Sequence, residues 1–375
     1  MSHVRRAVAC CGALAVTLSL AFSTAPVAHA TTPTVIAHAI AYLSASPPQI
    51  PLKVPASGSG AWDMDPASQF ATTEVVLAIA EAGQSGSSWS TAQAFGAVSG
   101  TTNPQGQSPL DFLNLVAADA TTPGQAAKYL VLVAKPLGLG TGALATTIGS
   151  PNPNGSFATD LHFTDTLFAA LAKKLLVGSV AASTVAYIES KQQAAGSWAY
   201  NADTTTGTDP DIDTTGLAVQ ALIAGGVAQN DPVITHALTW LASQQNADGT
   251  WSFFGDESAE STSRAVLAVT AAGYDPNARC WRDTVLPTAT AEPFVGADAA
   301  LASLAHPNGS ISGPNVFSAS YATGQAVQGL ERSWLPVARA TDVTCVPPPP
   351  VTTTPTTPVA MPVAVPVVVS PAFTG

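Results

Sequence analysis

A short alanine-rich segment that recurs along the chain constrains the fold more than any other feature. Its six copies start near residues 71, 121, 165, 213, 261 and 321. Each start carries a hydroxyl or carboxyl side chain that can cap a helix, and the three closest copies end at glycine, which stops one. A repeat of one helix with this long period indicates stacked helical hairpins, each too small to bury its own apolar face.

A second helix precedes most copies and ends in a turn of fixed chemistry. Residues 240–251 (WLASQQNADGTW) and 187–198 (YIESKQQAAGSW) are the clearest examples. Shorter echoes are Gly60-Ala-Trp62, Gly155-Ser-Phe157 and Gly309-Ser-Ile311, whereas the second repeat has no such turn. The unit is therefore predicted to be an outer helix, a Gly-x-aromatic turn and an inner helix. The inner helix is apolar on nearly every face, so we expect it to be buried all round.

Six such hairpins could form an open solenoid or a closed ring. An open solenoid needs terminal repeats with a polar outer face, and no such repeat is evident at either end. The sequence therefore favours an all-α fold of six helical hairpins closed around a central cavity.

The turn motif resembles that of a known family. Ala237, Trp240, Gln245, Gly249 and Trp251 stand at the spacing of the QW repeat of squalene and oxidosqualene cyclases. The resemblance implies the (α/α)6 toroid shared by terpenoid cyclases, protein prenyltransferase β-subunits, complement thioester domains and transcobalamin-like vitamin carriers. It also implies that the QW residues stabilise the ring rather than act on a substrate. The residues assigned to this structural role are Gln193, Trp198, Gln245 and Trp251.

Three segments divide the chain. Residues 1–30 have two arginines before the apolar run Ala7–Phe22 and small residues around a cleavage point, which predicts a secretory signal peptide. Residues 31–340 hold the repeats. Residues 341–375 are rich in Pro, Thr and Val and are predicted to be a disordered tail or extended linker. We therefore expect a protein that is secreted or held at the cell surface or cell wall.

Charge and cysteine content narrow the partners. After removal of residues 1–30, 24 acidic residues face 11 basic ones, a formal charge of −13. Nucleic acid is a poor partner for such a chain, and no further stretch is apolar enough to span a membrane. Only Cys280 and Cys345 remain, and the simplest expectation in an oxidising compartment is one disulfide between them. No zinc-binding Asp-x-Cys pair or thioester Gly-Cys-Gly-Glu-Gln motif is present, and we expect no metal and no cofactor.

One acidic motif at the start of the fourth inner helix hints at chemistry. Asp211-Ile-Asp213-Thr214-Thr215 resembles the Asp-x-Asp-Asp-Thr motif of class II terpenoid cyclases, with Thr in place of the last Asp. The resemblance implies that Asp213 is the protonating acid and that Asp211 and Thr214 are its neighbours. Two other roles remain open for Asp213. It could cap the helix, as Asp does well, or it could contact a ligand or a calcium ion.

The remaining candidates lie where inner helices begin, at the predicted mouth of the ring. Glu74 and Arg264 occupy the same repeat position and, with Asp213, Thr214 and Tyr321, are the predicted ligand contacts. The leading hypothesis is a non-catalytic, exported toroid that binds a small or apolar ligand, or a partner, at its central cavity. The first alternative is a terpenoid-cyclase-like enzyme that uses Asp213, and the second is a surface interaction scaffold.

Overall fold

The protein is described here by a computed structural model. It describes residues 32–44, 71–85, 88–102, 108–110, 113, 120–287, 293–314, 318–334 and 338–339. The predicted signal peptide and C-terminal tail lie outside these residues, so the boundaries at 30 and 340 stay predictions. No helix in the described ranges is long and apolar enough to cross a membrane.

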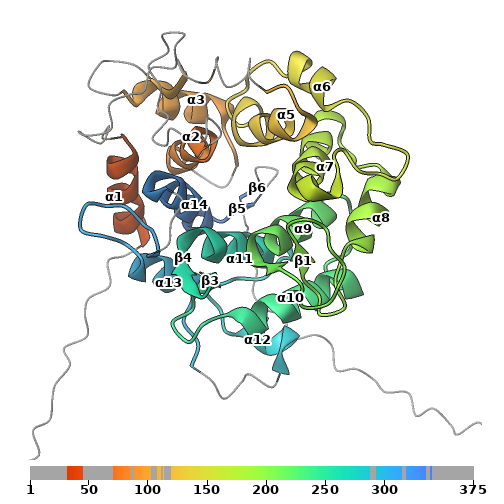
Figure 1. Cartoon of the computed structure of the whole chain (residues 1–375). Helices are drawn as coiled ribbons and strands as arrows, with labels where there is room; N and C mark the ends of the chain where they lie inside the picture. The colour runs from red at the N-terminus through yellow and green to blue at the C-terminus, as the bar shows by residue number, and fades with distance from the viewer. Residues whose placement is uncertain are drawn as a thin grey trace, which may run out of the picture.

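Six inner helices surround the centre of the molecule (Figure 1). They are α2 (Ala71–Ala82), α5 (Pro123–Tyr129), α7 (Phe163–Val177), α9 (Ile212–Ala224), α11 (Ala259–Ala271) and α14 (Ala319–Glu331). A π-helical segment, η1 (Leu130–Ala134), continues α5. Each inner helix begins within two residues of its predicted start, and α11 is buried along its entire length, as its all-round apolar pattern predicts.

The outer helices lie around this inner ring (Figure 1). They are α1 (Thr32–Ser44), α3 (Thr91–Gly100), α6 (Gly142–Ile148), α8 (Ala182–Ser190), α10 (Pro232–Gln244), α12 (Cys280–Val285) and α13 (Ala297–Ser303). A short 3-10 turn, η2 (Asp160–His162), precedes α7. Helix α14 packs against α2, and α1 packs against both α13 and α14, so the last hairpin contacts the first. The predicted closed, all-α toroid is confirmed.

Turn glycines hold successive hairpins at close range. Each has a positive φ, and a Cβ on it would lie only 2.0–2.6 Å from a carbonyl oxygen of the next hairpin. The pairs are Gly155 with Ser183, Gly196 with His236, Gly249 with Val295, and Gly309 with His38. The last pair joins the sixth hairpin to helix α1, so the turn that links neighbours elsewhere also closes the ring.

The aromatic residues of the turns are fixed by hydrogen bonds. Trp198 and Trp251 donate from Nε1 to the carbonyls of Ile188 and Leu241, each at 2.8 Å. The backbone N–H two residues after each turn glycine donates to a threonine hydroxyl of the following inner helix at 2.9–3.0 Å. These threonines are Thr166, Thr215, Thr262 and Thr323. They recur in four hairpins, yet the sequence analysis did not recognise them.

The glutamine that corresponds to Gln245 in the other clear turn is one residue earlier than the sequence alignment of the two turns predicted. Gln245 donates to the carbonyl of Gly249 at 3.1 Å, and Gln192, not Gln193, makes the equivalent bond to Gly196 at 2.9 Å. Gln193 is nevertheless buried, and it donates to the carbonyls of the loop that leads to α9. Both glutamines of this turn therefore bind backbone.

Three short antiparallel hairpins, which the sequence did not predict, connect to the ring. They are β1 (Trp198–Ala199) with β2 (Pro210–Asp211), β3 (Trp251–Phe253) with β4 (Asp256–Ser258), and β5 (Ser333–Trp334) with β6 (Ala338–Arg339). The first two lie between a Gly-x-Trp turn and the inner helix that follows it. They matter for function because β2 ends at Asp211, directly before α9.

Candidate functional site

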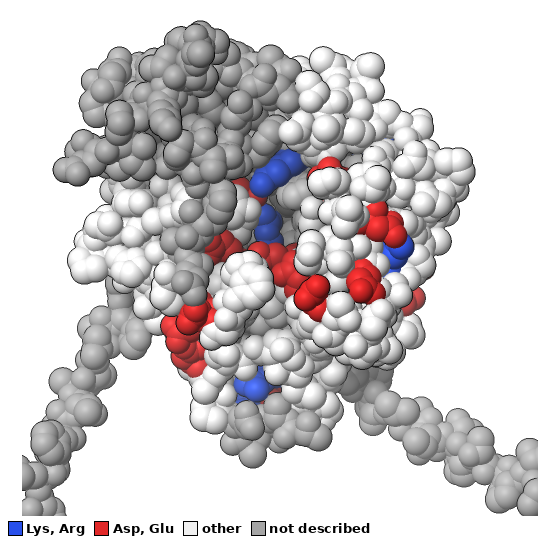
Figure 2. Space-filling view, viewed as in Figure 1, with Lys and Arg blue, Asp and Glu red and all other residues white. Residues whose placement is uncertain are grey.

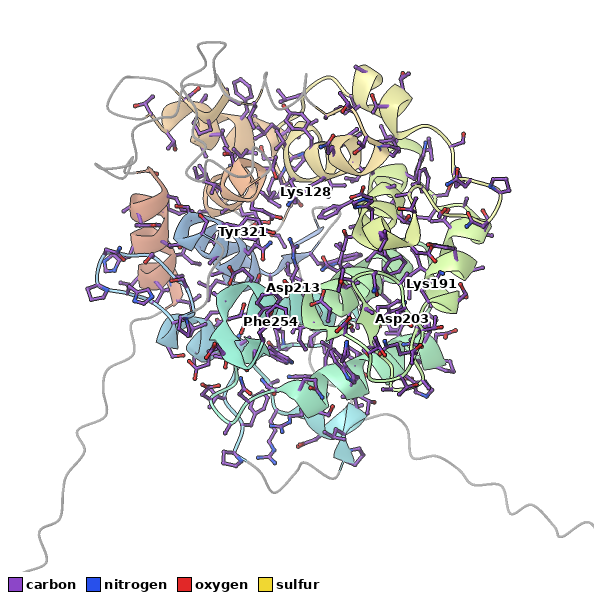
Figure 3. The ribbon with its side chains drawn as sticks, in the orientation of Figure 1. Lys128, Lys191, Asp203, Asp213, Phe254 and Tyr321 are labelled. Carbon is purple, nitrogen blue, oxygen red and sulfur yellow. The ribbon has the colours of Figure 1, made fainter. Side chains whose placement is uncertain are left out.

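A cavity of about 410 Å³ opens in the face of the ring, lined by residues of five inner helices. Figure 2 shows this hollow, with basic side chains in it and acidic side chains around it. In Figure 3, Lys128, Asp213 and Tyr321 surround the centre of the ring. The cavity is therefore open and lined by polar groups, rather than plugged by the ring's own apolar side chains.

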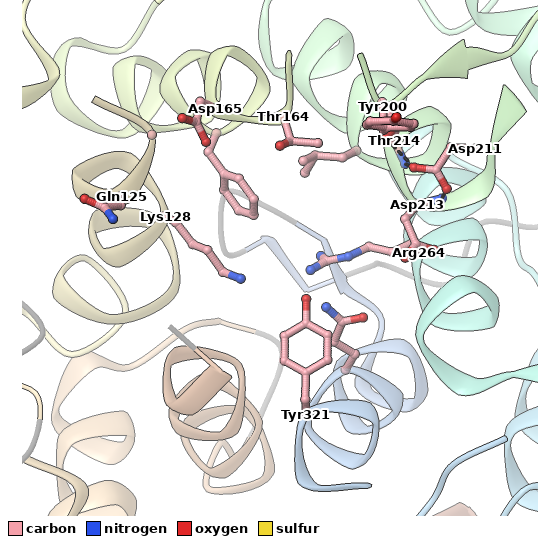
Figure 4. A pocket seen from close by; sticks show the side chains of 14 residues that line it. Gln125, Lys128, Thr164, Asp165, Tyr200, Asp211, Asp213, Thr214, Arg264 and Tyr321 are labelled. Carbon is pink, nitrogen blue, oxygen red and sulfur yellow. Dashed lines mark hydrogen bonds between the residues drawn. The ribbon is translucent and has the colours of Figure 1, made fainter. Parts of the chain in front are cut away.

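Two cations and a phenol form one wall of the cavity. Lys128 of α5 and Arg264 of α11 extend toward each other from opposite sides, with the hydroxyl of Tyr321 between them (Figure 4). The Lys128 ammonium lies 5.7 Å from the ring centre of Phe168 and 5.4 Å from that of Tyr321, within cation–π range. We refer to Lys128, Arg264 and Tyr321 as the cationic wall.

Glu74 of α2 lies behind this wall and is fully buried. Its carboxylate is 2.9 Å from Arg264 Nη2 and 3.2 Å from Lys128 Nζ, and it accepts a hydrogen bond from Gln328 at 2.8 Å. Burial alone would raise the pKa of Glu74, but the two cations and the Gln328 amide outweigh burial and lower the pKa to about 2. Glu74 is therefore a permanent counterion that holds both cations in place.

One donor of the cationic wall is left without a partner. Arg264 is only 5% exposed, its Nη2 pairs with Glu74, and its guanidinium interacts with the Tyr321 hydroxyl, whereas its Nη1 has no acceptor in hydrogen-bond geometry among the described residues. A buried guanidinium nitrogen without an acceptor costs free energy. The guanidinium in the cavity wall thus has hydrogen-bonding capacity that its described neighbours do not fully use.

The acidic motif lies opposite, at the start of α9. Asp211 is the helix cap, because its carboxylate accepts from the backbone N–H groups of Asp213 and Thr214 at 3.3 and 3.2 Å. Asp211 also accepts a hydrogen bond from the Thr214 hydroxyl. The capping role considered for Asp213 is therefore wrong, because the cap is two residues earlier.

Asp213 is left free of the helix end and lines the cavity. Its Oδ1 is buried and has no hydrogen-bond partner among the described residues. Burial and the nearby charge of Asp211 raise its pKa to about 7, opposed by a hydrogen bond from Ser261 and by the charge of Arg264. Asp213 is thus a carboxyl that is protonated in a large fraction of molecules near neutral pH.

Asp165 of α7 adds a third carboxyl at the edge of the cavity. Burial raises its pKa, opposed by the charges of His162 and Lys128. The Asp165 side chain lies directly against Gly124 of α5. A Cβ on Gly124 would lie only 1.9 Å from the Asp165 carboxyl carbon. A glycine in the first turn of α5 therefore makes the room that Asp165 occupies.

The structure brings most of the predicted ligand contacts together. Asp213, Thr214, Arg264 and Tyr321 all line the cavity, together with Asp211. Glu74 does not, because it lies behind the cationic wall.

Several lining residues were not predicted as site residues, among them Lys128 and Tyr200. A lysine inside the otherwise apolar stretch 126–134 was the available signal for the first. Tyr200, in the loop after β1, carried no signal.

Two further predictions concern metals and a disulfide. In the described part of the chain, no group of three or more His, Cys, Asp or Glu side chains could hold a metal ion. Cys280 begins α12, whereas Cys345 lies outside the described residues, so the disulfide between them stays a prediction.

The comparisons with known proteins point to one family. Residues 164–282 match the model of the squalene-hopene cyclase C-terminal domain. The chain resembles the terpenoid cyclases over this segment. The match contains both clear QW-like turns and the acidic motif, and it confirms the resemblance that those turns predicted.

Similar solved structures include the type II terpene cyclase MstE from Scytonema. Its apo form is 15% identical, with a TM-score of 0.48, and the match covers 80% of this chain and 97% of that chain. A variant of the same enzyme in complex with geranylgeranyl dihydroxybenzoate is 16% identical, with a TM-score of 0.48 and coverage of 80% and 96%. No curated protein matches the chain.

Proposed function

We propose that this protein is an exported, non-catalytic binder of a small organic molecule that carries an oxyanion, a carboxylate or a phosphate. The observation that carries the proposal is the pair of cations, Lys128 and Arg264, in the wall of an open cavity, where the Arg264 guanidinium keeps one nitrogen without an acceptor among the described residues. A guanidinium matches the planar oxygens of such groups and binds them strongly when water is excluded.

The charges around the wall support this choice. Glu74 provides one negative charge behind the two positive charges of Lys128 and Arg264, so the wall itself carries a net positive charge. Asp213, when protonated, is a hydrogen-bond donor and therefore does not repel an anion. An oxyanion in the cavity would accept from the cationic wall on one side and from Asp213 on the other.

The form of the cavity favours ligand binding over a scaffold role. Its volume of about 410 Å³ falls within the range of about 300–1,000 Å³ typical of small-molecule sites. A ring that served only as a scaffold would need neither this cavity nor the two cations, Lys128 and Arg264, that line it.

Native mass spectrometry tests the binding proposal. The protein is purified from the culture of its own host, and the released ligand is measured in wild type and in Arg264→Gln. We expect a small acidic molecule in wild type and its loss in the variant, with Arg279→Gln as a matched control because Arg279 is outside the cavity and pairs with Asp283. A wild-type protein that carries no ligand and binds no added carboxylate or alkyl phosphate would refute the proposal.

Acid catalysis is the second candidate, and the environment of Asp213 favours it. A carboxyl with a raised pKa, an unpartnered oxygen and a place in a cavity has the features of a general acid. In this alternative Asp213 protonates an alkene or epoxide, while Asp211 caps α9.

Incubation with squalene and with prenyl diphosphates tests the second candidate. Wild type should form a cyclic product, and Asp213→Asn should not. Thr164→Val, which alters another residue of the cavity lining, should retain the activity. Absence of any cyclic product from wild type removes acid catalysis of these substrates and leaves the binding proposal intact.

A further inference from the structure

A second pocket adjoins the central cavity at the rim of the ring. Its volume is about 380 Å³, and it lies between the loop before α9 and the β3–β4 hairpin. Tyr200 and Asp211 line both pockets, so the two are neighbours that share a wall.

The rim pocket gathers exposed aromatic side chains. Six large apolar side chains are exposed among the described residues: Phe95, Leu161, Val177, Tyr200, Phe253 and Phe254. Three of the six, Tyr200, Phe253 and Phe254, line this one pocket. Exposed apolar groups that gather around a pocket mark a binding surface, whereas single ones do not.

The β3–β4 hairpin holds its aromatic pair in a defined arrangement. The rings of Phe253 and Phe254 lie 4.4 Å apart in an edge-to-face arrangement. Phe254 is 90% exposed and adopts a φ of +48°, a conformation that costs a residue with a Cβ about 1 kcal/mol or more. The turn therefore presents a large apolar ring to solvent at a conformational cost, instead of burying it.

We propose that the rim pocket is the subsite for the apolar tail of the same ligand whose oxyanion occupies the central cavity. This inference rests on the proposed function and assigns the ligand class: an elongated amphipathic acid. The shared residues Tyr200 and Asp211 supply the continuity, because a ligand tail that leaves the central cavity past them enters the rim pocket. Asp209 lines the rim pocket but not the central cavity, and its carboxylate would repel a second anionic group there, so the part of the ligand that lies in the rim pocket is uncharged.

A series of straight-chain acids tests the inference. Binding of butanoate, octanoate and dodecanoate, and of the alcohols of the same lengths, is measured by calorimetry, with ligand-observed NMR for the weak binders. The proteins are wild type, Phe254→Ala and the matched control Phe95→Ala, which removes the same ring from α3, away from both pockets. Because Phe254 and Phe95 are both exposed, neither substitution should disturb folding.

The expected result is a dissociation constant that falls with chain length, by up to about fourfold per buried methylene. Phe254→Ala should weaken dodecanoate about tenfold and leave butanoate unchanged, and Phe95→Ala should change neither. Acids that bind wild type with no dependence on chain length or on Phe254 overturn the tail subsite but leave the oxyanion site standing.

The alcohols test the oxyanion anchor independently of the rim pocket, because they have the same chains but no charged group. Alcohols that bind as tightly as acids, with the same dependence on Phe254, support the rim pocket and refute the oxyanion anchor. Failure of every acid and alcohol to bind wild type refutes both proposals.

Discussion

Replacement of Asp213 by Asn should stabilise the protein at neutral pH and leave its stability unchanged in acid. The folded protein holds the pKa of Asp213 at about 7, compared with 3.8 for an ordinary aspartate. Below pH 3.8 both the folded and the unfolded chain carry the proton. Between pH 3.8 and 7 the unfolded chain loses it first, so the folded state is progressively disfavoured. The full difference is about 4 kcal/mol, and we expect about 2–4 kcal/mol because the side chain is only partly shielded from cavity water.

Asparagine imitates the neutral form of Asp213 and cannot ionise. The free energy of unfolding of wild type and Asp213→Asn is therefore compared by urea denaturation from pH 3.5 to pH 8, followed by the fluorescence of the buried Trp198 and Trp251. The two proteins should have similar stability at pH 3.5. The variant should gain an increasing advantage up to about pH 7 and a constant one above it.

A control with the opposite sign is available in Asp160. Hydrogen bonds from Lys191 and Tyr187 lower the pKa of Asp160. The ionised Asp160 therefore stabilises the folded state above the pKa of an ordinary aspartate, and this stabilisation is lost as the pH falls through the lowered pKa of the folded protein. Asp160→Asn should accordingly be slightly less stable than wild type at pH 8. If Asp213→Asn shows no pH-dependent advantage, or is less stable than wild type at pH 8, the assignment of Asp213 as a buried, protonated acid is wrong.

Three further predictions concern the ring and its ion pairs. Gly309→Ala should lower the free energy of unfolding, measured by urea denaturation, by about 2–4 kcal/mol more than Gly226→Ala does. Both glycines have a φ near +91°, but only Gly309 packs against another backbone. Equal losses would contradict closure of the ring through this contact. Thr215→Val should cost about 1–3 kcal/mol by the same measurement, since the N–H of Trp198 loses its acceptor in the core, and a change within error would show that this bond is dispensable. Glu74→Gln should cost about 3–5 kcal/mol at pH 7, because two cations lose their buried counterion. The cost should diminish as the pH falls from 4.5 toward 2, where wild-type Glu74 itself becomes protonated; a constant cost over that range would refute the lowered pKa.

The sequence predicted the ring itself because its signals are local. Helix caps, glycine stops and small apolar residues on every face are read within one hairpin, and each inner helix begins within two residues of the prediction. The Gly-x-Trp turn is also local, which is why the sequence could assign Trp198 and Trp251 to stability, and both are buried and donate to a backbone carbonyl. Thr215 and its equivalents were missed because a threonine near a helix start is an ordinary cap, and only the fold shows that it binds the preceding turn.

The candidate site was predicted less completely, because it depends on which inner helices face one another. Glu74 and Arg264 are 190 positions apart, and their pairing follows only from closure of the ring. The sequence could place both near helix starts but could not show that one satisfies the other behind the cavity wall. Lys128 joins them from a third helix.

The motif Asp211-Ile-Asp213 shows most clearly which properties the sequence determined and which the tertiary structure decided. Its position before an inner helix was readable in the sequence, together with the two roles of cap and acid. Which aspartate takes which role depends on the β1–β2 pairing that positions Asp211 to cap α9 and leaves Asp213 directed into the cavity. Local sequence therefore determined that this is a ring of helical hairpins, and the tertiary structure decided its chemistry, because burial and neighbouring charges exist only once the ring has closed.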